Sequence, residues 1–204
     1  MNVTELVNAC HFLSKIGLGT STSGNCSARV GDQIYLTATG CALADVTPDN
    51  LAVTDLRGNR LNDVKPTKEI GFHLAIFEKL PGVNSIVHVH PANGIVVSTL
   101  LDSAKRQEVP AITPQFVMRC GRVPVLPYHP PGSDELTGVV ADSCTGRRTL
   151  LLQNHGAIAF AENFKKALGI LEELEENCRL WVMSRPTGRT LNETEVAVLL
   201  NRTM

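Results

Sequence analysis

Apolar residues recur at helical spacing in several stretches of this sequence. Between residues 3 and 16 they fall every three or four positions, and Asn2 with Glu5 forms a capping-box pattern in front of them. The same spacing returns after Pro66-Thr67 and again at the end of the chain, where Asn192 and Glu195 resemble a second cap. The pattern predicts helices over residues 3–16, 66–77, 92–101 and 163–185, and one beginning at 192.

Runs of β-branched or alternating residues, bounded by glycine, asparagine or proline, indicate strands in much of the remaining chain. They predict strands over residues 26–30, 33–37, 51–55, 85–90, 123–126, 149–153 and 157–160. The proline-rich stretch 109–131 predicts a surface segment that contains only one short strand. Because helices and strands alternate irregularly, without repeated βαβ units, we expect an α+β fold with a mostly antiparallel sheet.

The composition is that of an ordinary globular protein. The chain has 204 residues, and 43% hydrophobic with 19% charged residues predicts one domain over residues 1–204 with a substantial core. A net charge of −1 argues against nucleic acid and anionic membranes as partners. The six cysteines form no C-x-x-C pattern, and the first residues do not resemble a secretory signal. We therefore expect a cytoplasmic protein with reduced thiols.

His88 and His90 lie on one predicted strand, directly before Pro91. Side chains on a strand repeat with period two, so both imidazoles point to the same face, roughly 6–7 Å apart along the strand. That spacing suits two ligands of one metal ion. It also suits two polar residues on the hydrated face of a sheet, so a third ligand is needed to decide.

Two loops of small residues follow predicted strands or helices. One covers residues 19–25 and ends in Gly24-Asn25, and the other is the turn around Thr39-Gly40. Glycine lets backbone N–H groups approach a ligand closely, while hydroxyl and amide side chains supply neutral donors. Such loops can hold a phosphate group, although their composition alone is equally compatible with flexible connections.

Glu69 lies in the expected first turn of the helix that Thr67 caps. A carboxylate there stabilises the helix dipole, which is sufficient reason for an acidic residue. Glu69 also precedes His73 by four residues, so the two side chains could pair on one helical face. No glycine-rich pattern fits a nicotinamide or nucleotide-triphosphate site, which makes both cofactor classes poor candidates.

These pieces occur together in an informative order. The chain contains Gly24-Asn25, Thr39-Gly40, Pro66-Thr67-Lys68-Glu69, His88-Val89-His90 and Gln153-Asn154-His155-Gly156. The set resembles the class II aldolase and adducin family over nearly the whole chain. The resemblance implies a three-layer α/β/α domain, with a mostly antiparallel sheet, that assembles as a homotetramer with active sites at subunit interfaces.

The resemblance also implies roles for individual residues. His88, His90 and His155 would hold a divalent metal ion, most often Zn²⁺ with Mn²⁺ as an alternative, and Glu69 would be the acid/base residue. The substrate would be a small phosphorylated sugar or sugar acid. Its phosphate would be bound by Gly24, Asn25, Thr39, Gly40, Thr67 and Lys68.

The function implied is that of a metal-dependent carbon–carbon lyase of the aldolase type, which cleaves a phosphorylated keto-sugar through a metal-stabilised enediolate. Glu69 favours this interpretation. Two features depart from the aldolase pattern: Lys68 replaces the usual serine, and residues 110–118 contain no tyrosine. The stretch 110–118, with residues 123–128 and 171–175, is more similar to a branch of the family that decarboxylates 3-oxo-tetronate 4-phosphates, and such a decarboxylase is the alternative. A sugar-phosphate 4-epimerase, a dehydratase and a non-catalytic adducin-like interaction module are further alternatives.

Overall fold

The computed structural model describes residues 2–105, 107–185 and 187–202 and is built around one seven-stranded sheet. The strands lie in the order β3-β2-β1-β4-β7-β6-β5, and only the β5–β6 pair is parallel. The mostly antiparallel sheet predicted from the sequence is therefore confirmed. The strands are β1 (Asn25–Val30), β2 (Gln33–Leu36), β3 (Ala52–Thr54), β4 (Ser85–Val89), β5 (Val125–Leu126), β6 (Thr149–Leu152) and β7 (Gly156–Ala161).

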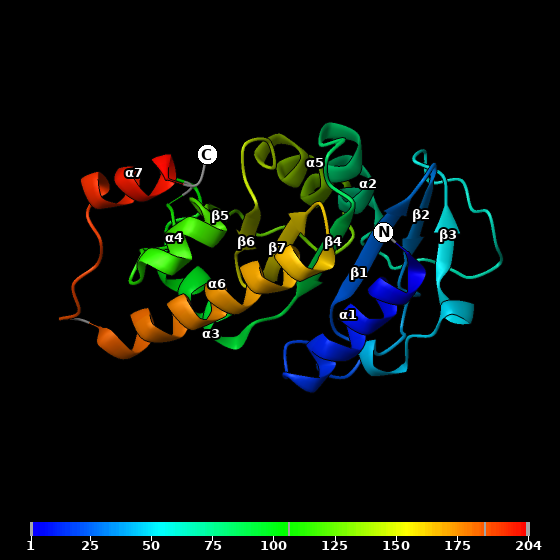
Figure 1. The fold of residues 1–204 in the computed structure, drawn as a ribbon, viewed down its shortest axis with the longest axis horizontal. Coiled ribbons are helices and arrows are strands. Elements are labelled where there is room, and N and C mark those ends of the chain that lie inside the picture. Colours follow the sequence, from blue (N-terminus) through cyan, green and yellow to red (C-terminus); the bar gives the residue numbers. More distant parts are fainter. Residues whose placement is uncertain (1, 106, 186, 203–204) are drawn as a thin grey trace.

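Helices cover both faces of the sheet, as expected for the three-layer fold (Figure 1). One apolar cluster joins the sheet to α1, α4 and α6, and a second joins its other face to α2 and α5. The long helix α6 crosses the sheet beside β4 and β7. The helices are α1 (Val3–Lys15), α2 (Ile70–Lys79), α3 (Ala92–Leu100), α4 (Pro114–Cys120), α5 (Asp134–Ser143), α6 (Phe164–Ser184) and α7 (Glu193–Asn201), with short 3₁₀ turns at Leu43–Asp45 and Pro48–Asn50.

Strand β4 lies in the middle of this sheet, between β1 and β7. Its side chains alternate between the two apolar clusters: Val87 and Val89 pack on the α6 side, while Ile86 packs on the α2 side. His88 continues the alternation of Ile86 and contacts Phe72 of α2 edge-on, with 5.5 Å between ring centroids. The central strand thus carries a buried histidine toward the α2 layer.

Two of the sequence expectations about connections were wrong. The proline-rich stretch 109–131 contains helix α4, whose Phe116, Val117 and Cys120 are buried. Pro114 occupies the first turn of this helix, where a missing N–H costs nothing, and Thr113 caps it by accepting from the Phe116 N–H. Helix α5 was not predicted, although Ser133 caps it in the same way.

The two capping boxes predicted at Asn2/Glu5 and Asn192/Glu195 are both present. Helix α7 packs against α4, and the Leu191 N–H donates to the Ala111 carbonyl at 2.8 Å. Across the described ranges, the helices all lack either the length or the apolar character needed to traverse a lipid bilayer.

Candidate active site

Three histidines from two parts of the chain meet at one end of the sheet. His88 lies near the end of β4, His90 follows that strand, and His155 lies in the tight turn between β6 and β7. The Nε2 atoms of His88 and His90 are 3.1 Å apart, and one ring nitrogen from each of the three lies within 4.8 Å of the others. His88 is fully buried, while His90 and His155 are mostly buried. His155 is therefore the third candidate ligand that His88 and His90 need to hold a metal ion.

Gly156 allows this close approach. A Cβ atom at Gly156 would lie 2.5 Å from the Val89 carbonyl oxygen, 2.8 Å from the His90 ring and 3.2 Å from the His88 ring. No side chain fits there without moving the strand or the rings. Asn154 just before adopts φ +57°, a left-handed conformation that asparagine tolerates. The Asn-His-Gly sequence is thus explained by the geometry of the turn.

The environment keeps the imidazoles neutral. His88 Nδ1 lies 3.1 Å from the Ala157 carbonyl oxygen, which can only accept, so Nδ1 carries the proton and Nε2 presents a lone pair. Burial lowers the pKa of His88 well below its ordinary value, and the neighbouring His155 and His90 lower it further. Burial also lowers the pKa of His90 and of His155. All three are therefore neutral near pH 7, as metal ligands must be.

Glu69 brings its carboxylate to the same point. Its Oε2 lies 3.3 Å from His88 Nε2, and its Oε1 lies 3.5 Å from His155 Nε2. Asn25 Nδ2 donates to Oε2 at 2.8 Å. Burial raises the pKa of Glu69 above its ordinary value, while the Asn25 hydrogen bond and His155 oppose that rise. A buried carboxyl with a raised pKa can exchange a proton near neutral pH.

Two details of the predicted helix start were wrong. Helix α2 begins at Ile70, so Glu69 is its N-cap residue and lies before the first turn. Glu69 makes no side-chain cap bond, and Thr67 Oγ1 instead accepts from the Glu69 N–H at 3.3 Å. The expected pairing of Glu69 with His73 is indirect, because Asn25 lies between them. The carboxylate is thus free to face the histidines.

The arrangement of these groups fits a bound cation. The lone pair of His88 Nε2 faces Glu69 Oε2, and two acceptors 3.3 Å apart repel each other unless positive charge lies between them. Glu69 Oε1 is also buried, and within the described residues it accepts no hydrogen bond. Three neutral imidazoles from His88, His90 and His155 form a donor set that Zn²⁺ uses in catalytic sites open to substrate.

The loops predicted to bind phosphate lie side by side with the Glu69 segment. The Thr67 N–H donates to the Thr37 carbonyl at 3.0 Å, and the Thr39 N–H donates to that of Lys65 at 3.1 Å. These bonds bring Thr39-Gly40 next to Thr67-Lys68. Lys68 is exposed and Thr67 is buried. The two segments therefore lie next to each other immediately before Glu69.

Gly24 and Asn25 lie at the start of β1, and the Asn25 side chain contacts Glu69. Gly24 has φ +85°, and a Cβ atom there would lie 2.9 Å from the His88 carbonyl oxygen. This glycine lets the first loop approach the histidine strand closely. Asn25 is 6% exposed, and its side chain is hydrogen-bonded to Glu69 and His73. Its amide therefore holds the carboxylate in this structure.

Sequence reasoning missed Glu175 of α6. Its carboxylate accepts from the Asn93 N–H at 3.0 Å, from Asn93 Nδ2 at 2.7 Å and from the Gly94 N–H at 3.0 Å. These groups belong to the first turn of α3, which begins directly after His90-Pro91. Pro91 occupies the N-cap position and makes no side-chain cap bond. Glu175 therefore fixes the turn that carries His90, and a proline in the cap position was the one available signal.

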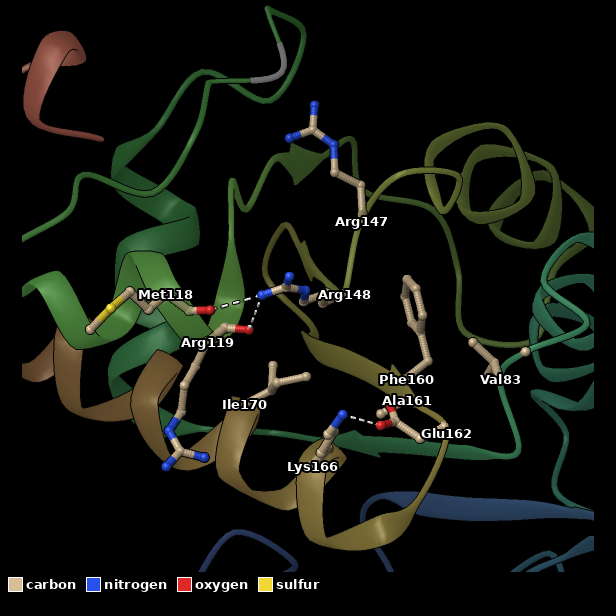
Figure 2. A pocket seen from close by; sticks show the side chains of 11 residues that line it. Val83, Met118, Arg119, Arg147, Arg148, Phe160, Ala161, Glu162, Lys166 and Ile170 are labelled. Carbon is tan, nitrogen blue, oxygen red and sulfur yellow. Dashed lines mark hydrogen bonds and ion pairs between the residues drawn. The ribbon is translucent and has the colours of Figure 1, made fainter. Parts of the chain in front are cut away.

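A cavity of about 600 Å³ opens at the opposite end of β4 and β7 (Figure 2). Its lining includes four cationic side chains, Arg119, Arg147, Arg148 and Lys166. Arg148 donates to the Met118 carbonyl at 2.8 Å, and Lys166 pairs with Glu162, as Figure 2 shows. Among the described residues that line it, none is a site residue predicted from the sequence. This cavity is distinct from the histidine cluster.

The fold and this site agree with the comparison to known families. The family model of the class II aldolase and adducin N-terminal domain matches residues 4–182. The chain therefore belongs to the class II aldolase and adducin family, as the sequence motifs predicted.

Similar proteins with named activities indicate the class of reaction. The 3-oxo-tetronate 4-phosphate decarboxylase of Haemophilus influenzae is 34% identical over 188 residues, which cover 91% of this chain and 90% of the relative. The L-fuculose phosphate aldolase of Escherichia coli K12 is 30% identical over 203 residues, covering 97% and 92%. The crystal structure of YgbL from Klebsiella pneumoniae, a candidate aldolase, epimerase or decarboxylase, superposes with a TM-score of 0.89 at 32% identity and covers 96% of each chain. The relatives with named activities are lyases, so the predicted family, fold class and lyase class are confirmed.

Proposed function

We propose that this protein is a divalent-metal-dependent carbon–carbon lyase acting on a small phosphorylated keto-sugar or sugar acid. The observation that carries the proposal is the position of the Glu69 carboxylate, 3.3 Å from His88 Nε2 and 3.5 Å from His155 Nε2. A group that can transfer a proton thus lies next to a candidate metal centre. Such a pair suits a reaction in which charge develops on a carbon next to a carbonyl group.

The residues divide the chemistry between them. His88, His90 and His155 would hold the divalent ion, which would supply positive charge beside the substrate carbonyl. Glu69 takes up or returns the proton at the substrate, because burial has raised the pKa of its carboxyl. The hydrogen bond from Asn25 orients that carboxyl. The histidines remain neutral, so they do not compete with Glu69 for the proton.

The leaving group is an aldehyde or carbon dioxide, and each has its own support. The Glu69 carboxylate in the histidine cluster favours the aldolase-type reaction, in which a base must remove a hydroxyl proton before the carbon–carbon bond breaks. Greater similarity to 3-oxo-tetronate 4-phosphate decarboxylases, at 32–34% identity against 30% for the aldolases, favours loss of carbon dioxide. The helix α4 segment also contains no tyrosine. Epimerisation and dehydration need the same acidic residue and are third-ranked alternatives.

The two leading reactions end at the same compound. Loss of carbon dioxide from a 3-oxo-tetronate 4-phosphate leaves dihydroxyacetone phosphate after the new carbanion takes up a proton. Cleavage of L-fuculose 1-phosphate between carbons 3 and 4 leaves the same ketone phosphate together with an aldehyde. The final protonation is therefore common to both, and it falls to Glu69 in this proposal.

The phosphate group is proposed to bind at Gly24, Asn25, Thr39, Gly40, Thr67 and Lys68. The adjacency of Thr39-Gly40 and Thr67-Lys68, directly before Glu69, supports this assignment. Exposed Lys68 offers the positive charge. Zn²⁺ is the proposed metal, and cytoplasmic location and a homotetramer with active sites at subunit interfaces complete the proposal. Sedimentation of the purified protein tests the assembly state.

A substrate panel tests the proposed function. The zinc-loaded and manganese-loaded proteins are offered a 3-oxo-tetronate 4-phosphate and L-fuculose 1-phosphate, with carbon dioxide release and aldehyde trapping as the two readouts. Formation of either product at a rate that depends on added metal supports the proposal and identifies the leaving group. If neither substrate nor related phosphorylated keto-sugars and keto-acids yield a product with either metal, the lyase assignment is wrong.

A further inference from the structure

Behind Glu69 lies a buried hydrogen-bond network of four side chains. Ser27 Oγ lies 2.7 Å from His73 Nδ1, His73 Nε2 lies 2.6 Å from Asn25 Oδ1, and Asn25 Nδ2 lies 2.8 Å from Glu69 Oε2. Asn25 and Ser27 are two residues apart on β1, so their side chains lie on the same face of the strand. His73 lies on α2, one helical turn after Glu69. Ser27 and His73 are 0% exposed. The network therefore crosses from the sheet to the helix within the core.

The direction of every hydrogen bond in the network follows from Glu69. An ionised carboxylate only accepts, so the NH₂ group of Asn25 must face it and the amide oxygen must face His73. His73 then carries its proton on Nε2 and donates to Asn25, which leaves Nδ1 to accept from the Ser27 hydroxyl. Burial lowers the pKa of His73 to about 3, so the neutral His73 ring carries one proton, on Nε2, at neutral pH. Donors thus run Ser27 to His73 to Asn25 to Glu69.

We propose that Ser27 and His73 are positioning residues that act on the acid/base carboxyl through Asn25. This inference rests on the proposed function, in which Glu69 moves the substrate proton. A rotation of the Asn25 amide by half a turn would place its oxygen against the Glu69 carboxylate. His73 opposes that rotation, because its Nε2 proton pairs only with the amide oxygen while the Ser27 hydroxyl donates to Nδ1. Glu69 is thereby kept with one oxygen held and the other facing the histidine cluster.

A purely structural role for His73 is the competing explanation. Its ring stacks on Phe72 with 4.6 Å between centroids, so it also fills core space. His73→Phe retains an aromatic ring at this position and removes both hydrogen bonds. Ser27→Ala removes only the donor to Nδ1, and Ser27→Thr restores a hydroxyl. Ser85→Ala is a matched control, because Ser85 is an equally buried strand serine whose hydroxyl donates to the Ala161 carbonyl at 3.0 Å, outside the network.

The first arm of the experiment measures the His73 tautomer in the metal-free wild-type protein by long-range ¹H–¹⁵N NMR, with His73→Phe identifying the signal. The expected spectrum shows a protonated Nε2 and an unprotonated Nδ1 at pH 7, and Ser27→Ala shifts the Nδ1 resonance. A protonated Nδ1 in the wild type overturns the proposed direction. This arm needs no substrate, so it decides the network even if the proposed function fails.

The second arm measures deuterium exchange from solvent into the hydroxymethyl carbon of dihydroxyacetone phosphate by zinc-loaded protein. His73→Phe and Ser27→Ala should slow the exchange roughly 10–100-fold at unchanged zinc content, with Ser27→Thr near the wild type. Ser85→Ala should leave the rate within about twofold even if its Tm falls. Equal rates for wild type and His73→Phe, or equal losses in Ser27→Ala and Ser85→Ala, overturn the positioning role. No exchange by the wild type contradicts the proposed function instead.

Discussion

The polar groups at the two ends of strands β4 and β7 differ in whether they already have bonding partners. At one end, His88, His90 and His155 lie around the Glu69 carboxylate, and the lone pair of His88 Nε2 faces Glu69 Oε2 at 3.3 Å. At the other end, cationic side chains line an open cavity (Figure 2). The histidine cluster could hold a metal ion, and the buried Glu69 Oε1 has no hydrogen-bond partner among the described residues, which fits a binding site.

Around the cavity, Arg119, Arg147 and Lys166 have acidic partners, and Arg148 donates to backbone carbonyls. Arg147 Nη1 donates to Glu108 at 3.0 Å, and Arg119 Nε lies 3.9 Å from Glu173. Lys166 pairs with Glu162 four residues earlier. The comparison teaches that the number of charged residues around a hollow is a poor guide to function here. The better guide is whether buried donors and acceptors already have partners, and substitutions at the two ends test that difference.

Replacing His155 should have the largest effect. His155→Ala removes one of three ligands, so the protein should bind zinc weakly and lose roughly 10³-fold or more of its turnover, because several kcal/mol of charge stabilisation disappear. Zinc content after dialysis and initial rates measure this. Turnover close to that of the wild type in a metal-free variant would show that the histidine cluster is not the reactive centre.

Glu69→Gln should come next and should distinguish the two lyase reactions. In an aldolase it should lower turnover about 10²–10⁴-fold, since general acid–base catalysis is lost. A decarboxylase needs no base to begin, so carbon dioxide release should keep much of its rate, with solvent in place of Glu69 supplying the final proton. Zinc content is the control, because the ligands are intact. The same rate loss accompanied by loss of zinc would instead make Glu69 a metal ligand.

Glu175→Ala should have a moderate effect on the turn that carries His90. Without the carboxylate, three donors at the start of α3 lose their acceptor, and the free energy of unfolding should fall by about 1–2 kcal/mol. Zinc affinity should fall several-fold. Glu176→Ala is the matched control, since exposed Glu176 bonds Arg179 alone among the described residues and its removal should cost less than about 0.5 kcal/mol. Equal costs for the two variants would remove the assigned role of Glu175.

Lys166→Gln should have the smallest effect. It breaks an exposed pair with Glu162, so stability should change by less than about 0.5 kcal/mol and turnover should stay at the wild-type level. Chemical denaturation and initial rates are the measurements. A large drop in turnover would mean that the cationic cavity takes part in the reaction, and the contrast between the two ends would no longer hold.

The sequence predicted those parts of the fold and site that depend on local periodicity or on recognisable motifs. The period-two rule placed His88 and His90 on one face, and their Nε2 atoms are 3.1 Å apart. His155 came from family resemblance, because nothing local relates residues 88 and 155. Helix α4 was missed since its proline was interpreted as a loop residue, whereas Pro114 begins the helix.

The interactions around the site could not be predicted because they join distant residues. Asn25 contacts Glu69 and His73, which are 44 and 48 positions away, and Glu175 caps a helix 82 positions earlier. No periodicity signals such contacts. Asn25 and Glu175 each satisfy buried polar groups of another element, and only the packing of the sheet against α2 and α6 brings them there.

In the proposed function, carbon–carbon bond cleavage requires a metal ion bound at the histidine cluster. The most direct test removes metal from the protein with a chelator and titrates Zn²⁺ back, while turnover of the active substrate from the panel is followed. Turnover should be absent at first, rise in proportion to bound zinc and level off at one ion per chain. Full turnover in the metal-free protein would contradict the account.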